Sequence, residues 1–436
     1  MSSDWCSLSF ADLMERGALE IGDGYRAKND ELGGTGLIFL RAGHVKDTHI
    51  DFEGVDRFRH TDCGRFGRKI ARAGDVVITT KGNSTGRVAY VGVGMPGFVY
   101  SPHLSYWRAN AESEVDQGFL RAWSQSKEFL DQLDSLSRST DMAPYLSLSD
   151  QRRLRITLPP VATQRAVAKL NDEIHDRFAL LRETNATLEA IAQALFKSWF
   201  VDFDPVRAKQ QGLVPAGMDE AMAALFPDGF EDSQRGSIPV GWSVKPIYEF
   251  ASVIYGAPFV SSKFNGEGIG RPLIRIRDLR DEAPGVCTPE THPKGYVVRA
   301  GDIVVGMDGE FRAYLWGGEE AWLNQRVCVF APKQGVPAAF VRSTIEPLLA
   351  HVEATETATT VIHLGKNDID RFRALVPNPE VLWAFASVVN PVYAGIVSSK
   401  QAARTLATLR DTLLPRLISG QLRLPQAGIE LTKVTA

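Results

Sequence analysis

The chain contains 436 residues, of which 44% are hydrophobic and 23% are charged, and its formal net charge is −3. A chain of this length is too long for one hydrophobic core, so we expect two or more domains. The composition is that of an ordinary soluble protein, and the nearly neutral charge argues only weakly against nucleic-acid binding.

Neither a targeting segment nor a metal-binding cysteine pattern is expected. The start of the chain, Met-Ser-Ser-Asp-Trp, lacks the basic and apolar stretches of a signal peptide. The longest apolar window, residues 385–397, is too short to span a bilayer. The four cysteines lie far apart without a Cys-x-x-Cys pair, so neither a zinc ribbon nor a disulfide framework is predicted. These features fit a cytoplasmic protein.

Residues 1–160 predict a mixed, strand-rich α/β domain. Apolar residues at helical spacing predict a helix from Phe119 to Leu133, and Pro159-Pro160 closes the domain. Short apolar or alternating runs bounded by Gly, Asp and Pro predict strands at 37–40, 75–79, 87–91 and 104–107.

Residues 161–204 predict one long helix, uninterrupted by Pro or Gly. Its apolar residues recur at seven-residue intervals from Val167 to Leu195, which is the pattern of a coiled-coil seam. A Pro- and Gly-rich linker over 205–237 comes next, with a short helix near Met218 to Leu225. A second mixed domain covers 238–379, a second helix covers 380–422, and a tail covers 423–436. Asn390-Pro391 predicts a kink or break in the second helix.

The chain contains an internal repeat. Arg72-Ala73-Gly74-Asp75 returns as Arg299-Ala300-Gly301-Asp302, each at the start of an apolar strand. Ser101-Pro102-His103-Leu104 matches Asn324-Gln325-Arg326-Val327. The offset shrinks through the globular parts and then stays constant from Leu146 to Leu195, which match Leu364 and Leu413. The fold class is therefore α+β, with two mixed α/β domains in tandem, each followed by a long helix.

Two equally spaced apolar seams predict that the helices pair with each other as an antiparallel coiled coil; the alternative is that each packs on its own domain. The residues expected in this helix pair and in partner interfaces are Leu181, Leu188, Ile191, Leu195, Phe196, Trp199, Leu406, Leu409, Leu413 and Leu417.

No pattern in the chain predicts catalysis or a metal site. Gly92-Val93-Gly94-Met95-Pro96-Gly97 has the letters of a dinucleotide-binding motif, but a strand comes after it, so we interpret it as a hairpin turn. No P-loop and no Asn/Asp-Pro-Pro-aromatic motif occurs. Asp75 with Lys81 imitates part of a nuclease site, yet the second copy has Asp308 in place of Lys81.

Taken together, these motifs resemble the specificity subunit of a type I restriction-modification enzyme. The resemblance extends from Trp5 to Leu422. Departures are Pro391 within the second helix and Asn378-Pro379 where a Pro-Pro pair is usual. The residues on which the resemblance rests are Leu158-Pro159-Pro160 with Gln164, the stretch from Ala194 to Pro205 containing Phe-Lys-Ser-Trp-Phe, Ile238-Pro239-Val240-Gly241-Trp242, both Gly-Asp strand starts, Asn324-Gln325-Arg326-Val327, and Leu409 to Gly420 containing Leu-Leu-Pro-Arg-Leu.

The resemblance implies two target-recognition domains that each read one half of a split double-stranded DNA site, with the helices as a ruler for the unread spacer. It implies two methyltransferase partners that use S-adenosylmethionine to methylate adenine, and two motor-nuclease partners that use ATP and Mg²⁺. No cofactor or metal is expected on this chain itself, and it is not expected to be an enzyme.

Basic residues outnumber acidic ones between Arg57 and Arg87 and between Lys263 and Arg280, which favours contact with phosphates. Base reading requires side chains that reach the major groove, where Arg, Lys, Asn and Gln can make bidentate contacts. Lys81 and Asn83 become Asp308 and Glu310 in the second copy, so the two half-sites should differ; a carboxylate can accept from cytosine N4. The candidate DNA-binding residues are Tyr25, Arg26, Lys28, Asn29, Lys81, Asn83, Ser84, Arg87, Ser261, Ser262, Lys263, Asn265, Asp308, Glu310 and Arg312.

Three alternatives stay open at this point. The chain could serve a methyltransferase-only or other defence complex, which its own sequence does not distinguish. A nuclease with fused recognition domains would need a cutting activity of its own. A bivalent protein or glycan scaffold would show no salt-dependent binding to DNA.

Overall fold

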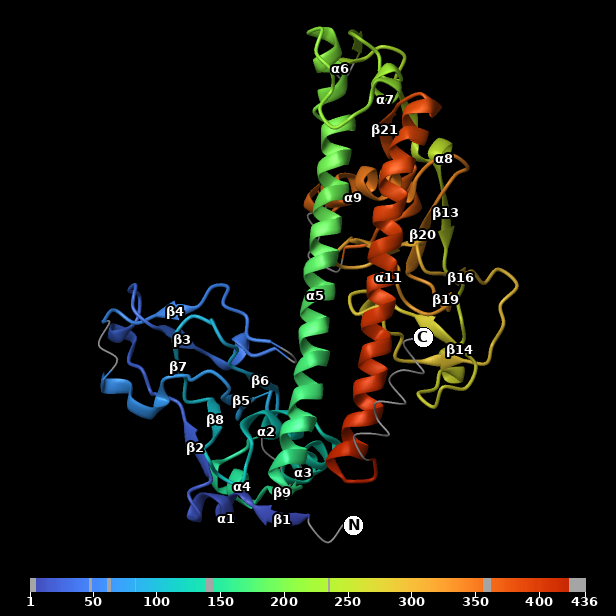
Figure 1. The fold of residues 1–436 in the computed structure, drawn as a ribbon. Coiled ribbons are helices and arrows are strands. Elements are labelled where there is room, and N and C mark those ends of the chain that lie inside the picture. The colour runs from blue at the N-terminus through green and yellow to red at the C-terminus, as the bar shows by residue number, and fades with distance from the viewer. Residues whose placement is uncertain are drawn as a thin grey trace. The chain divides into compact units, whose positions relative to one another are not determined.

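The computed structural model describes residues 5–46, 49–60, 64–82, 84–137, 145–233, 236–355 and 362–422. The chain forms two compact units. Unit 1 comprises Met1–Arg177 and Leu406–Ala436, and unit 2 comprises Phe178–Thr405. Each unit therefore takes part of both long helices, α5 (Val161–Phe200) and α11 (Pro379–Ile418), which Figure 1 shows in green and red.

Unit 1 has three sheets. β1 (Cys6–Ser9) pairs with β9 (Arg155–Leu158). The four-stranded sheet has the order β2 (Leu19–Asp23), β8 (Leu104–Ala109), β5 (Val76–Thr79) and β6 (Val88–Tyr90). The third has the order β4 (Asp56–Arg57), β3 (Ile38–Leu40) and β7 (Phe98–Tyr100). The helices α1 (Phe10–Glu15), α2 (Gln117–Trp123), α3 (Lys127–Ser137) and α4 (Leu148–Arg153) surround them.

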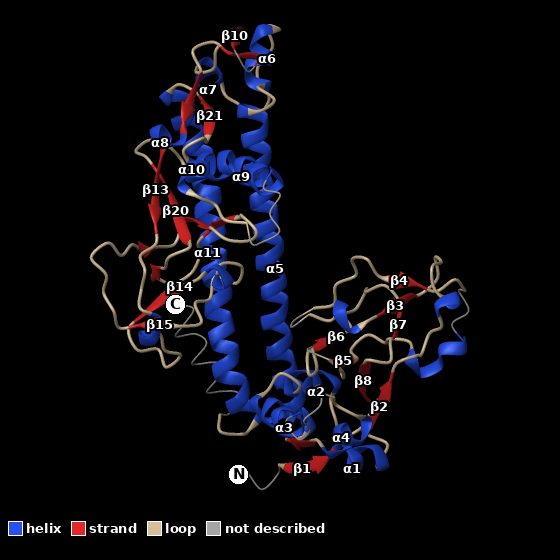
Figure 2. Ribbon diagram, turned by 180° about the vertical axis from the view of Figure 1, so that it is seen from behind, coloured by secondary structure: helices blue, strands red, loops and turns tan. Residues whose placement is uncertain are grey.

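Unit 2 repeats the terminal strand pair and the four-stranded sheet of unit 1, and its third sheet has one strand more, which confirms the internal repeat and the α+β class. β12 (Ser243–Pro246) pairs with β21 (Arg373–Val376). The four-stranded sheet has the order β13 (Ala251–Tyr255), β20 (Val327–Pro332), β17 (Ile303–Gly306) and β18 (Ala313–Leu315), and Figure 2 shows β13 beside β20. The other sheet has the order β15 (Cys287–Thr288), β14 (Arg271–Ile274), β19 (Ala321–Leu323) and β16 (Val297–Val298).

The remaining elements of unit 2 are mostly helical. α6 (Asp204–Gln210) and α7 (Glu220–Ala224) come after α5, and the hairpin of β10 (Phe230–Ser233) and β11 (Gly236–Pro239) precedes β12. α8 (Ile247–Phe250), α9 (Ala338–Thr355) and α10 (Lys366–Ile369) pack around the sheets. α5 ends at Phe200, and Phe203 caps α6 in the left-handed conformation at φ 56°.

The antiparallel helix pair is confirmed within each unit. In unit 2 the rings of Trp199 and Phe200 near the end of α5 lie 5.4 and 4.9 Å from Phe385 near the start of α11. Leu188 also faces Gly395, and the segments of the two helices that belong to unit 2 lie side by side (Figure 1). In unit 1, Leu409, Leu413 and Leu417 of α11 share a core with Val167 of α5.

Three local expectations were wrong. The predicted helix from Phe119 to Leu133 is two helices, because α2 ends at Trp123 and α3 starts at Lys127. Residues 92–97 form a turn, but it joins β6 to β7, which belong to different sheets, so it closes no hairpin. The helix α11 continues through Pro391, since buried Phe385 and Val389 on one side and Ile396 on the other anchor both halves in one core.

The same packing explains the apolar composition of α11. By length and composition alone, the helix is long and apolar enough to cross a membrane. This is weak evidence for a membrane span, because the core helices of soluble proteins meet the same criterion. The apolar stretch is thus wider than the window expected from the sequence. Its residues Val381, Leu382, Phe385, Val389 and Ile396 are buried in the core of unit 2, and this burial explains part of the stretch.

The two Gly-Asp strand starts are structural. Gly74 has φ 94°, which glycine adopts without strain, and it lets the buried Asp75 turn back to accept from Arg72 N at 2.8 Å. Asp75 also accepts from Arg108 and from the Tyr100 hydroxyl at 2.8 Å. In unit 2, Asp302 accepts from Arg299 N at 2.8 Å and from Tyr296 at 3.1 Å. Asp75 is thus engaged as a packing anchor, in contrast to the free carboxylate of a nuclease.

Candidate nucleic-acid interface

Several loops of unit 1 converge at one edge of its four-stranded sheet. Backbone hydrogen bonds join them: Tyr25 N donates to Tyr100 O at 2.6 Å, and Ser101 N to Leu40 O at 3.0 Å. Thr80 N donates to His103 O, and Leu146 N to Thr80 O, both at 2.9 Å. We call residues 24–29, 41–43, 80–87, 101–103 and 145 the loop edge of unit 1. Side chains that are distant in sequence therefore share one surface.

The side chains of this loop edge are polar and largely exposed. Lys81 and His103 are exposed, and Tyr145 is 54% exposed beside Lys81, with which it forms a β-bridge. Arg41 donates to Asp56 at 2.8 Å and lies 5.2 Å over the Phe39 ring. A pocket of about 360 Å³ opens among them, and its lining includes Asn29, Arg41, Ser101 and His103. The edge can offer cationic donors and amide groups to a ligand that carries acceptors.

The candidate residues of the first polar loop divide into two kinds. Tyr25 donates to Glu31 at 3.0 Å, and its ring packs edge-on against Phe58 and Phe66, so its role in unit 1 is to hold the loop. Arg26, Lys28 and Asn29 are exposed. The interaction of Arg65 with Tyr25 at 3.0 Å and with Glu31 completes this support and raises the pKa of Arg65.

The second loop is a tight polar turn after β5. Gly82 and Gly86 both have φ 90°, which restricts these positions to glycine in practice. Thr79 accepts from Arg87 N at 3.0 Å and closes the turn. Lys81 and Arg87 are exposed and Ser84 is half-buried, whereas Asn83 lies outside the described residues. Thr80, the residue before Lys81, is hydrogen-bonded through its backbone to His103, a residue that the sequence did not single out as a contact.

Unit 2 builds an equivalent loop edge with different side chains. Gln325 N donates to Ala257 O at 2.9 Å, Met307 N to Arg326 O at 2.9 Å, and Leu364 N to Met307 O at 2.8 Å. Asp308 forms the β-bridge with His363 that corresponds to the bridge of Lys81 with Tyr145. The loop edge of unit 2 comprises residues 256–257, 307–312, 324–326 and 363.

Arg326, Asp308 and His363 form a charged cluster on this edge. His363 Nδ1 lies 2.7 Å from Asp308 Oδ1, and Arg326 Nη1 lies 3.4 Å from the same oxygen and 3.0 Å from His363 Nδ1. The side chains are 28% to 56% exposed. Arg326 and His363, like His103 and Tyr145, were missed as candidates. The internal repeat contained the signal for Arg326 and His103, which occupy matched turns with different residues.

The other candidates of unit 2 lie on two loops. Ser261, Ser262 and Lys263 are exposed, with Lys263 Nζ 3.9 Å from Glu290. Asn265 is held internally, since its Oδ1 accepts from Ile269 N and its Nδ2 donates to Ile269 O, both at 2.9 Å. Glu310 is exposed, and Arg312 donates to Glu353 at 2.9 Å. Asn265 therefore shapes its loop, whereas the exposed residues are available to a ligand.

The residues predicted for the helix pair lie mainly inside the two units. Leu181 and Trp199 are buried, and Leu188, Leu195 and Phe196 pack against the core of unit 2. Leu409, Leu413 and Leu417 are buried in unit 1, and Leu406 is half-buried. Ile191 is 43% exposed, which places it on the outer face of α5 and outside the seam.

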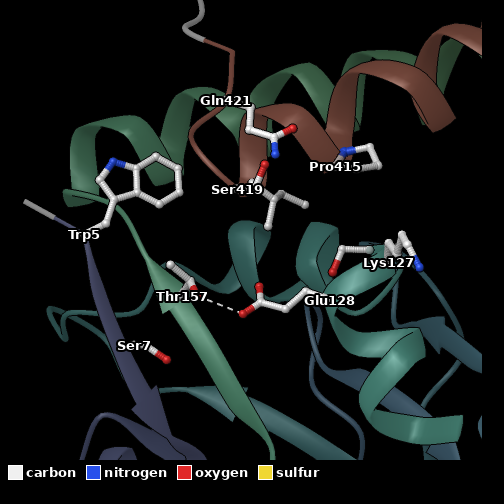
Figure 3. Close-up of a pocket in the computed structure, with 10 residues that line it drawn as sticks. Trp5, Ser7, Lys127, Glu128, Thr157, Pro415, Ser419 and Gln421 are labelled. Carbon is white, nitrogen blue, oxygen red and sulfur yellow. Dashed lines mark hydrogen bonds between the residues drawn. The ribbon is translucent and has the colours of Figure 1, made fainter. Parts of the chain in front are cut away.

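A separate pocket of about 430 Å³ in unit 1 lies among Trp5, Thr157 and the end of α11 (Figure 3). Its carboxylate, Glu128, is occupied: Oε1 accepts from Thr157 at 2.8 Å and Oε2 from Trp123 at 2.9 Å. Lys127 is likewise engaged, with Asp131 at 2.8 Å. Within the described part of the chain, no group of three or more His, Cys, Asp or Glu residues could hold a metal ion. The polar loop edges are therefore the better candidate sites.

Comparisons with known proteins agree on one family. No family model matches the chain. The HindI specificity subunit of Haemophilus influenzae is 22% identical over 88% of this chain and 94% of that protein. The EcoBI specificity subunit of Escherichia coli is 30% identical over 43% of this chain and 40% of its own length. The solved type I restriction-modification S subunit from M. genitalium shares the fold, with a TM-score of 0.54, 14% identity and coverage of 95% and 96%.

Proposed function

This chain belongs to the family of type I restriction-enzyme specificity subunits, and we propose that it reads a two-part DNA sequence for partner enzymes. Unit 1 contacts one half-site through its loop edge, and unit 2 contacts the other. The protein acts in the cytoplasm, where its partners methylate adenine and cut foreign DNA.

One observation carries this proposal: the same fold presents different chemistry at matched positions. Lys81, His103 and Tyr145 of unit 1 correspond to Asp308, Arg326 and His363 of unit 2. The supporting strands keep their order and pairing. A repeated scaffold with changed edge residues is what two different half-sites require, because donors and acceptors on base edges differ between base pairs.

The local charge supports contact with the DNA backbone. Basic residues such as Arg68 and Lys69 cluster in unit 1 although the whole chain has a net charge of −3. Lysine and arginine that neutralise phosphates supply affinity without sequence information. Side chains on the loop edges then add the sequence preference through the major groove.

The helices support a ruler function. α5 and α11 each contain 40 residues, and each passes from one unit into the other. A continuous helix cannot lose or gain a residue without rotating and shifting all the residues beyond that point. We infer that the pair sets the length of the unread spacer between the half-sites.

The chemistry of the system belongs to partners in this proposal. Two methyltransferase subunits supply S-adenosylmethionine-dependent methylation, and two motor-nuclease subunits supply ATP- and Mg²⁺-dependent restriction. The chain itself contributes recognition and assembly. Two features of unit 1 favour this division, since both Asp75 and Glu128 are engaged in internal hydrogen bonds.

DNA binding by the purified full chain with its methyltransferase subunit tests this function. Affinity for a duplex library should fall steeply between about 50 and 200 mM salt, as expected when several phosphates are contacted. Salt-independent binding, or none, would contradict the proposal and favour a scaffold role. Metal-dependent cleavage by this chain alone would instead support the nuclease alternative.

A further inference from the structure

The turn before β20 holds an arginine in a strained backbone conformation at the loop edge of unit 2. Arg326 has φ 71°, in the left-handed region that residues other than Gly, Asn and Asp rarely adopt. Only three other non-glycine residues of the described chain have positive φ: Glu112, Phe203 and Glu282. Such strain persists where the surrounding structure fixes the residue, and it gathers at functional positions.

The side chain of Arg326 is held on one side only. Its Nη1 lies 3.4 Å from Asp308 Oδ1 and 3.0 Å from His363 Nδ1, which is itself 2.7 Å from Asp308 Oδ1. A ring nitrogen that donates to the carboxylate cannot also accept from the guanidinium, so Asp308 is the acceptor that holds Arg326, and His363 packs beside the pair. No described residue accepts a hydrogen bond from its Nε or Nη2, and 56% of the side chain is exposed. The guanidinium is therefore oriented by one corner and presents its remaining donors to solvent.

We propose, building on the proposed function, that Arg326 reads a guanine in the half-site of unit 2 and that Asp308 and His363 position it. A guanidinium donates two parallel hydrogen bonds to guanine O6 and N7 in the major groove. Asp308 already faces Arg326 and His363, so it orients the reader and does not itself contact cytosine N4. This reassigns the role that the sequence alone indicated for Asp308.

Because the backbone at Arg326 is left-handed, its side chain can be removed by a substitution that does not strain the fold. Arg326→Gly removes the side chain at a position where glycine is free of strain, so the fold should be retained with an unchanged or higher Tm. Arg299→Ala is the matched control, because Arg299 is exposed and ion-paired with Glu320 at 3.4 Å at the opposite end of β17. Asp308→Asn tests the positioning role, since it removes the charge that holds the guanidinium.

The test uses the full chain with its methyltransferase subunit, on duplexes that carry the motif found by mapping methylated adenines. In Arg326→Gly, the preference for guanine over other bases should fall at one position of one half-site, on the order of 10- to 100-fold. Replacing that guanine by 7-deazaguanine, which lacks the N7 acceptor, should weaken the wild type but not Arg326→Gly. Asp308→Asn should show a partial loss at the same base, and Arg299→Ala none.

Three outcomes would overturn this inference while leaving the proposed function intact. The wild type gives a split motif without a guanine in either half-site. Arg326→Gly leaves discrimination at each guanine unchanged. Or Arg326→Gly weakens all duplexes equally and the 7-deazaguanine penalty persists, which identifies a phosphate contact. A wild-type complex that recognises no split motif would instead contradict the proposed function itself.

Discussion

In unit 1, Nη2 of Arg108 lies 2.6 Å from Oδ2 of the buried Asp75. Arg108 is 7% exposed, so removal of the carboxylate leaves a buried cation with only the more distant Glu20, whose Oε1 lies 3.9 Å from Arg108 Nη1. We predict that Asp75→Ala lowers the free energy of unfolding by about 3 kcal/mol or more. Asp302→Ala in unit 2 is the matched comparison: it loses only Tyr296 and a backbone donor, so its cost should be clearly smaller. Urea denaturation of both variants measures the difference, and equal losses would contradict it.

The pH dependence of Asp302 should have the opposite sign to that of a salt-bridged carboxylate. Burial raises the pKa of Asp302 above its ordinary value of 3.8. The folded state then holds its proton more tightly than the unfolded state, so stability falls as pH rises from about 3.8 through the raised pKa. The substitution Asp302→Asn removes this dependence. The stability of this variant relative to wild type should therefore increase as the pH is raised from acid to neutral, and a decrease would contradict the prediction.

Lys400 of α11 forms hydrogen bonds with Glu282 and Leu315 of unit 2. Its Nζ donates to the buried Glu282 and, at 2.7 Å, to Leu315 O, and Glu282 also accepts from Gly317 N at 2.8 Å. Lys400→Ala leaves this carboxylate without its cation, so we predict a loss of about 2 to 4 kcal/mol in the free energy of unfolding. Lys366→Ala, which breaks an exposed pair with Asp370, is the control and should leave the urea unfolding midpoint unchanged.

Lys81 should contribute to affinity for DNA in general if it contacts a phosphate. Lys81→Ala should then weaken binding to all duplexes and reduce the slope of log K against log salt by about 1. Lys127→Ala is the control within unit 1, because Lys127 is ion-paired with Asp131 at 2.8 Å on α3. An unchanged slope together with a lost base preference would instead identify Lys81 as a base reader.

The ruler function predicts the effect of a paired insertion. Seven residues, about two helical turns, inserted near Thr184 of α5 and near Ala402 of α11 keep the heptad register. Both positions lie near the level at which Leu188 meets Gly395. The preferred spacer should lengthen while both half-sites stay the same. A changed half-site sequence after this insertion would refute the ruler.

Much of the fold could be predicted because repetition and periodicity are properties of the chain itself. The heptads from Val167 to Leu195 indicated α5, and the Gly74-Asp75 and Gly301-Asp302 pairs marked β5 and β17. Pro391 was misjudged since a proline's local cost can be outweighed by the packing of Phe385 and Ile396, which the sequence does not display.

The sequence indicated which loops to consider as candidate sites, but it did not indicate all the residues that the structure brings together there. Tyr25 and Asn265, both predicted to contact DNA, are hydrogen-bonded within their own loops, to Glu31 and to Ile269. His103, Arg326 and His363 join the loop edges through backbone pairing between strands distant in sequence. Such convergence depends on register, which no single segment of the chain encodes.

The most direct test of the central claim is a map of methylated adenines in genomic DNA after the full chain is co-expressed with its methyltransferase subunit. The account predicts one motif in two parts, with two different half-sites and a spacer of fixed length. A complex that forms but methylates no such motif, or a single continuous one, would contradict the assignment of one half-site to each unit.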